Sequence, residues 1–153
     1  MIDLRLPPLL ISLALAALLP QAAAAQSAAA GKWRTIDDET GHERSVVELQ
    51  QVDGQLQGRI LQIFQRPDEK PDPICEACEG ERKNQPILGM TFLWGLKPDG
   101  ANAWAGGSIL DPKNGKIYNA KASLTDDGKA LRVRGYIGTP LLGRTQTWQR
   151  EAQ

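Results

Sequence analysis

The chain has 153 residues, and its 18 basic residues equal its 18 acidic residues, so the formal net charge is zero. The equal numbers of basic and acidic residues, and the absence of a polybasic tract, argue against a nucleic-acid-binding protein and against recruitment by anionic lipid. The length corresponds to one domain.

The first 25 residues have the pattern of a cleaved signal peptide. Arg5 precedes an apolar run, Leu6–Leu19, which is interrupted only by Pro7, Pro8 and Ser12. This run is too short to cross a bilayer, and alanines follow it, as signal peptidase requires. Cleavage could follow Ala24, Ala25 or Ala30. We expect a signal peptide at 1–25, a flexible leader at 26–30, a single domain at 31–151, and a periplasmic or secreted location.

Beyond the leader, the chain shows no convincing amphipathic helix. Short alternating segments are separated by turns rich in Gly, Asp, Asn and Pro, such as Asp53-Gly54 and Asn114-Gly115. We expect eight strands: Lys32–Ile36, Glu43–Gln50, Gln55–Phe64, Gly89–Leu96, Ala101–Leu110, Lys116–Leu124, Lys129–Ile137 and Leu142–Arg150. Evenly spaced antiparallel strands are most stable when closed, because closure leaves no free edge. The fold class is therefore all-β: a single up-and-down barrel with one long irregular loop.

Alternation in two of these strands indicates which side chains face the barrel interior. Ala120 and Ala122 share a face with Tyr118 and Leu124, and Leu131, Val133, Gly135 and Ile137 share another. Small inward side chains are compatible with the taper of a filled barrel or with space for a ligand, and taper is the more common arrangement.

A nine-residue motif occurs twice. Residues 86–94, PILGMTFLW, align without gaps with residues 140–148, PLLGRTQTW. The two copies begin the fourth and the last expected strands, which are four strands apart. We expect them on opposite walls, where they would plug the same end of the barrel.

Four aromatic side chains are candidates for lining a ligand cavity. Trp94 and Trp104 flank the turn Pro98-Asp99-Gly100, and Phe92 and Tyr118 lie in neighbouring strands. Binding pockets are usually apolar with a few polar groups, although core packing is the more common role of such rings.

The polar residues do not form a recognisable catalytic or metal-binding pattern. Cys75 and Cys78 could form a disulfide, a redox pair or part of a metal site. Two cysteines in an exported chain favour the disulfide, a redox pair needs a helix N-terminus, and a zinc site needs about four ligands. His42 is the single histidine and has no nucleophile in a recognisable motif near it. We therefore expect no catalytic residue, no metal and no cofactor, and interpret the protein as a non-enzyme.

Several motifs resemble known families. The start Gly31-Lys32-Trp33, together with Arg150 late in the last strand, resembles the lipocalins and related calycin barrels. That resemblance implies that Trp33 and Arg150 pack together and close one end of the barrel.

More closely, Gly31–Arg150 resembles a bacterial exported family known as domain of unknown function 2147. The motifs that carry this resemblance are Cys75-x-x-Cys78, Pro86-Ile87-Leu88-Gly89, Asp111-Pro112-x-x-Gly115, Val133-Arg134-Gly135-Tyr136 and Gly143-Arg144-Thr145-Gln146. This family implies a lipocalin-like barrel in the bacterial envelope and no established activity.

Two functional hypotheses follow. The first is a barrel that binds a small hydrophobic or amphipathic ligand such as a lipid. The second is a filled barrel that acts on a protein partner through the loop at 65–88. The state of the interior discriminates between them, because an apolar cavity of a few hundred cubic ångströms favours the first.

Overall fold

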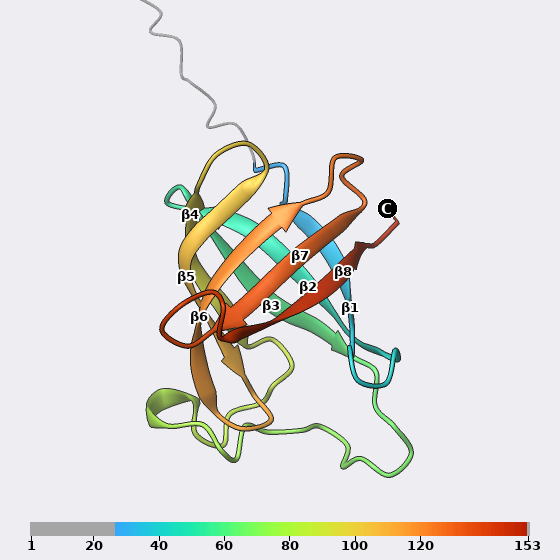
Figure 1. Ribbon diagram of the computed structural model, residues 1–153. Helices are drawn as coiled ribbons and strands as arrows, with labels where there is room; N and C mark the ends of the chain where they lie inside the picture. Colours follow the sequence, from blue (N-terminus) through green and yellow to red (C-terminus); the bar gives the residue numbers. More distant parts are fainter. Residues whose placement is uncertain (1–26, 153) are drawn as a thin grey trace, which may run out of the picture.

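A computed structural model describes residues 27–152, and the expected signal peptide lies outside the described residues. The fold is the predicted all-β barrel, with eight antiparallel strands closed in sequence order (Figure 1). The strands are β1 (Gly31–Ile36), β2 (Glu43–Val52), β3 (Gln55–Ile63), β4 (Thr91–Pro98), β5 (Ala103–Asp111), β6 (Lys116–Leu124), β7 (Ala130–Tyr136) and β8 (Gly143–Arg150). One turn of 3-10 helix, η1 (Gly80–Arg82), interrupts the long segment between β3 and β4. Within the described range, no helix is long and apolar enough to span a membrane.

The antiparallel order gives the barrel two distinct ends. The base carries the start of β1, the end of β8 and the three tight turns between β2 and β3, β4 and β5, and β6 and β7. The opposite end, called the loop end below, carries residues 37–42, 64–90, 112–115 and 137–142. In Figure 1 the long green segment and the turn after β5 lie at the bottom, at the loop end. All long connections are therefore at one end.

Large side chains fill the interior. β4 and β8 lie on opposite walls, because three strands separate them on either side. The rings of Phe92 on β4 and Trp148 on β8 nevertheless meet, with centroids 5.8 Å apart. Since these rings meet across the barrel, its centre is occupied by aromatic side chains.

Small residues in the strands provide space for large neighbours. Trp104 lies directly opposite Ala122 in the β5–β6 ladder, and both are buried. A Cβ on Gly58 would lie 2.9 Å from Leu49 and 3.1 Å from Leu93. The small positions therefore accommodate neighbouring side chains, which corresponds to the filled alternative for the alanine-rich face.

Two details differ from the sequence predictions. The two copies of the repeated motif do lead into strands on opposite walls at the loop end, but they do not plug it. Leu141 and Leu142 are 89% and 68% exposed, and Leu88 is also exposed.

Ile137 was expected to face inward, but β7 ends at Tyr136 and Ile137 is 65% exposed. A two-residue alternation holds only while the strand continues, so it does not orient residues beyond the strand end.

The close packing predicts a large effect for one added methyl group. A Cβ on Gly107 would lie 2.7 Å from both the Leu96 side chain and the Trp94 carbonyl oxygen. Gly107→Ala should therefore lower the free energy of unfolding by roughly 1–3 kcal/mol, as overpacking does in other cores. Urea denaturation measures this value. Ser108→Ala, at the next position of β5, is the control and should change it by less than about 0.5 kcal/mol; equal effects of the two substitutions would contradict the packed interior.

Candidate functional site

The base of the barrel is sealed by Trp33 and Arg150. The Arg150 guanidinium lies over the Trp33 ring, 4.2 Å from the ring centroid, and Trp33 is fully buried. Trp33 and Arg150 are also direct partners in the β1–β8 ladder. The structure thus brings together the two residues that the lipocalin resemblance paired.

The residues just before β1 take part in this seal. The Trp33 indole N–H donates to the Ala29 carbonyl at 2.9 Å, and Ala29 is fully buried. Arg150 donates to the carbonyl oxygens of Ala28 at 2.8 Å and Ala30 at 3.1 Å. The sequence interpretation assigned these residues to a flexible leader, whereas their carbonyl groups are bound by Trp33 and Arg150. Alanines carry no side-chain signal for such contacts, since only their backbone is used.

The four aromatic candidates do not line a common cavity. Phe92 and Trp104 are each only 7% exposed and belong to the core. Trp94 is half-buried and packs against the core, and the Arg82 guanidinium lies over its ring. Of the four, Tyr118 lines a cavity, at the loop end.

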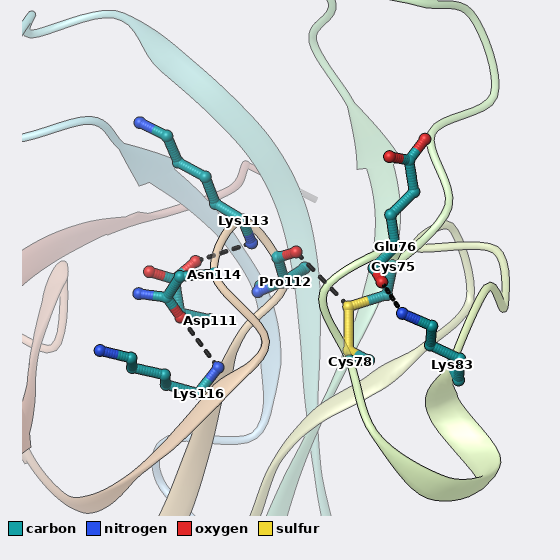
Figure 2. Close-up of a disulfide and its surroundings, with 9 residues drawn as sticks. All are labelled: Cys75, Glu76, Cys78, Lys83, Asp111, Pro112, Lys113, Asn114 and Lys116. Carbon is teal, nitrogen blue, oxygen red and sulfur yellow. Dashed lines mark hydrogen bonds between the residues drawn. A yellow bond between two sulfur atoms is a disulfide. The ribbon is translucent and has the colours of Figure 1, made fainter.

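The disulfide segment, residues 75–89, packs on the turn between β5 and β6 at the loop end. Cys75 and Cys78 form a disulfide, and both are buried, at 0% and 2% exposure. Cys75 Sγ lies 3.4 Å from the Pro112 carbonyl oxygen, a close contact because a bridged sulfur has no proton to donate (Figure 2). A Cβ on Gly115 would lie only 1.9 Å from the Ala77 carbonyl oxygen. The backbone of this segment therefore rests directly on the turn between β5 and β6.

Backbone hydrogen bonds hold the rest of the segment in place. Cys75 N–H donates to the Gln85 carbonyl at 2.8 Å, and Asn84 N–H donates to the Cys75 carbonyl at 2.9 Å. Gly89 N–H donates to the Ile60 carbonyl at 2.8 Å, which ties the end of the segment to β3. The long connection is therefore a fixed part of the loop end.

Two cavities open to solvent at this end. The first, of about 430 Å³, lies beside η1 and β4 and includes Arg82, Glu81 and Met90. The second, of about 400 Å³, lies between the disulfide segment and the start of β6; we call it the Tyr118 groove. Its lining includes apolar side chains, two basic residues and one acidic residue: Leu110, Ile117, Ile137, Tyr118, Arg82, Lys116 and Glu79.

Arg82 lines both cavities. Its guanidinium lies over the Trp94 ring, 4.6 Å from the centroid. It forms no ion pair with any residue in the described range, and neither does Lys116. Arg82 carries no signal in the sequence, because it lies within the irregular segment and is 12 positions from its aromatic partner.

A strong ion pair lies at the mouth on the β1–β8 side. Arg144 binds the Asp38 carboxylate with two guanidinium nitrogens, of which Nη2 lies 2.5 Å from Oδ1. Gln146 approaches the same carboxylate at 3.5 Å. The hydrogen bond from Arg144 lowers the pKa of Asp38 below its ordinary value and raises the pKa of Arg144. This pair connects the first turn to the last strand.

Among residues 27–152, no group of three or more His, Cys, Asp or Glu side chains is placed to hold a metal ion. The cysteines are bridged, and His42 lies exposed in the turn between β1 and β2.

The closed eight-strand architecture defines a lipocalin-like barrel. A solved structure with the same fold is Protein HP1028 from Helicobacter pylori, described as belonging to the lipocalin family; its TM-score is 0.69 at 20% identity, covering 81% of this chain and 83% of that one. The chain belongs to the family described as "Uncharacterized protein conserved in bacteria (DUF2147)", whose pattern matches residues 31–150. No curated protein matches the sequence.

The Asp38–Arg144 pair predicts a pH-dependent contribution to stability. Because the pKa of Asp38 is lower in the fold than its ordinary 3.8, the contribution is complete above that value and is lost as the pH falls through the lower folded pKa. Asp38→Asn should destabilise the protein at pH 7 by roughly 0.2–1 kcal/mol, the range for exposed pairs. The difference from the wild type should shrink progressively below about pH 4.

Denaturant titrations between pH 2 and 7 measure this difference. Asp126→Asn, which removes an exposed turn carboxylate without an ion pair in the described range, is the control. A difference between Asp38→Asn and wild type that stays constant down to pH 2 would contradict the assignment.

Proposed function

We propose that this protein is an exported, non-catalytic binding protein of the bacterial envelope, and that its ligand is a small amphipathic molecule with an anionic head. The Tyr118 groove is the proposed site. The observation that carries the proposal is an apolar wall beside two basic residues, Arg82 and Lys116, which outnumber the one acidic residue of the lining, Glu79. Neither basic residue forms an ion pair among the described residues. Its volume lies within the usual range for ligand sites, about 300–1,000 Å³.

The filled interior supports a site at the loop end over a site inside the barrel. Lipocalin-like barrels can enclose a ligand, but here Phe92 and Trp148 meet across the lumen. Of the aromatic candidates, Tyr118 is retained in this proposal. Phe92 and Trp104 would have to leave the core to touch a ligand, and Trp94 would contribute only by orienting Arg82.

Decanoate provides a direct test of the site. Isothermal titration of the mature protein should detect decanoate, and decanol, which has the same chain without the charge, should bind at least tenfold more weakly. Arg82→Gln and Lys116→Gln should each raise the Kd for decanoate about tenfold or more, since a hydrogen bond to a charged group contributes about 1.5–3 kcal/mol. Lys97→Gln, which removes an exposed cation at the base, is the matched control. Equal binding of decanoate by the wild type, the two test variants and the control variant would contradict the Tyr118 groove as the binding site. The absence of decanoate binding would contradict it too.

The second candidate is a protein-interaction role for the segment at 65–88. The filled barrel is compatible with this role, because an interaction scaffold does not need an internal cavity. Native mass spectrometry of the protein isolated from its own periplasm discriminates between the two. A bound small molecule supports the first candidate, whereas a bare protein that also ignores decanoate favours the second.

The contacts at the base also bear on export. Cleavage after Ala30 would remove the carbonyl groups that Trp33 and Arg150 bind, so we infer cleavage after Ala24 or Ala25. Intact-mass measurement of the exported protein should find a chain beginning at Ala25 or Gln26, lighter than the reduced form by two hydrogen atoms because of the disulfide. A chain beginning at Gly31, or two free thiols, would contradict this inference.

A further inference from the structure

The last three strands have an entirely basic charge pattern. β6, β7 and β8 contain no acidic residue, although the whole chain is neutral. They carry six basic residues: Lys116, Lys121, Arg132, Arg134, Arg144 and Arg150. Arg144 is paired with Asp38 and Glu39, and Arg150 faces the base. Lys121, Arg132 and Arg134 remain on the outer face and form no ion pair within the described part of the chain.

Two of these cations are direct neighbours. Lys121 and Arg134 lie opposite each other in the β6–β7 ladder, and Arg132 lies opposite Ser123 and Thr147. Like charges directly opposite each other destabilise a sheet, and no carboxylate on these strands offsets them. The outer face of β6 and β7 therefore has a positive potential without an internal counter-charge.

An apolar tip adjoins this face at the loop end. It consists of Ile117, Ile137, Leu141 and Leu142, each more than half exposed. Ile117 and Ile137 line the same groove, and Ile137 N–H donates to the Leu142 carbonyl at 3.0 Å. The four exposed residues therefore gather at the same end of the barrel, on the start of β6 and the connection between β7 and β8.

Arg134 connects the basic face to the apolar tip. Its guanidinium donates to the Pro140 carbonyl at 2.6 Å, to the Leu141 carbonyl at 3.4 Å and to Thr145 Oγ1 at 2.8 Å. These neutral acceptors hold the connection between β7 and β8 and leave the positive charge uncompensated. The leucines are therefore presented on a fixed loop.

We propose that this surface, made of the apolar tip and the basic outer face of β6 and β7, docks on an anionic phospholipid bilayer. Leucine and isoleucine side chains would enter the boundary between headgroups and acyl chains, and Lys121 and Arg132 would contact lipid phosphates. Two signals of this kind, one apolar and one basic, are what stable peripheral attachment requires. A nucleic acid would gain nothing from the leucines. This inference goes beyond the proposed ligand function and does not depend on it.

Vesicle sedimentation tests the proposal. The mature protein is mixed with vesicles of phosphatidylcholine alone or of phosphatidylcholine and phosphatidylglycerol at 3:1, at low and high salt. The expected result is binding to the anionic vesicles, at least tenfold weaker binding to neutral vesicles, and loss of binding at high salt. Lys121→Gln with Arg132→Gln should weaken binding roughly 25-fold, or about fivefold for each cation near the surface.

The apolar and basic contributions each have a matched control. Leu141→Ser with Leu142→Ser should weaken binding about tenfold or more, whereas Val52→Ser, an exposed apolar residue at the base, should not. Lys32→Gln with Lys97→Gln removes the same charge from other strands and should change binding less than threefold. Circular dichroism verifies that each variant is folded.

Several results would overturn the docking surface. One is no binding of the folded wild type to anionic vesicles. Another is an equal loss of vesicle binding in the test variants and in their control variants. A dimer that dissociates on Leu141→Ser with Leu142→Ser, without vesicle binding, would show that a second copy covers the tip. Binding to a polynucleotide in place of vesicles would also overturn it. Decanoate titration without vesicles is an independent measurement, so failure of one proposal is distinguishable from failure of the other.

Discussion

The barrel depends on the seam between its first and last strands. The β1–β8 ladder contains two residue pairs, Trp33 with Arg150 and Arg34 with Gln149, whereas the neighbouring β7–β8 ladder has seven. Side chains compensate for this short ladder. Arg150 covers the Trp33 ring and also donates to carbonyl groups of the leader and to the Gly128 carbonyl at 2.7 Å. On the other side of the seam, Arg34 binds Glu151. Closure therefore rests on guanidinium groups that join distant parts of the chain.

A closed and filled barrel restricts recognition to its ends and outer surface. Phe92 and Trp148 occupy the centre, and Trp33 and Arg150 occupy the base. The remaining irregular surface is at the loop end, where the disulfide segment rests on Gly115. The short loop closed by the disulfide gives a small entropic stabilisation compared with a long one, so its main effect is to fix the shape of this segment. A rigid rim of this kind can hold cations such as Arg82 in defined positions.

The proposed ligand groove and the proposed membrane surface adjoin each other at the loop end. Ile117 and Ile137 line the Tyr118 groove and also belong to the apolar tip. A molecule leaving a bilayer at this point would meet an apolar wall and two cations without crossing open solvent. The filled lumen is compatible with such exchange, because neither proposed site needs the barrel to open.

Alternation and turn residues determined the number of strands, their order and their limits to within two residues, because hydrophobic period and Gly or Asn turns act locally. The two cysteines of an exported chain also favoured the disulfide, and the lipocalin resemblance implied the pairing of Trp33 with Arg150. Tertiary structure decided the rest. Packing across the barrel placed Phe92 and Trp104 in the core, and backbone contacts fixed Ala28–Ala30. A neutral chain without a polybasic tract still formed a basic face, because pairing of β6 with β7 aligned Lys121, Arg132 and Arg134. Strand alternation places each of these side chains on the outer face, but only the register of the β6–β7 ladder sets Lys121 opposite Arg134. That register is set by the turn and by the packing of the barrel, which the pattern of either strand alone does not contain.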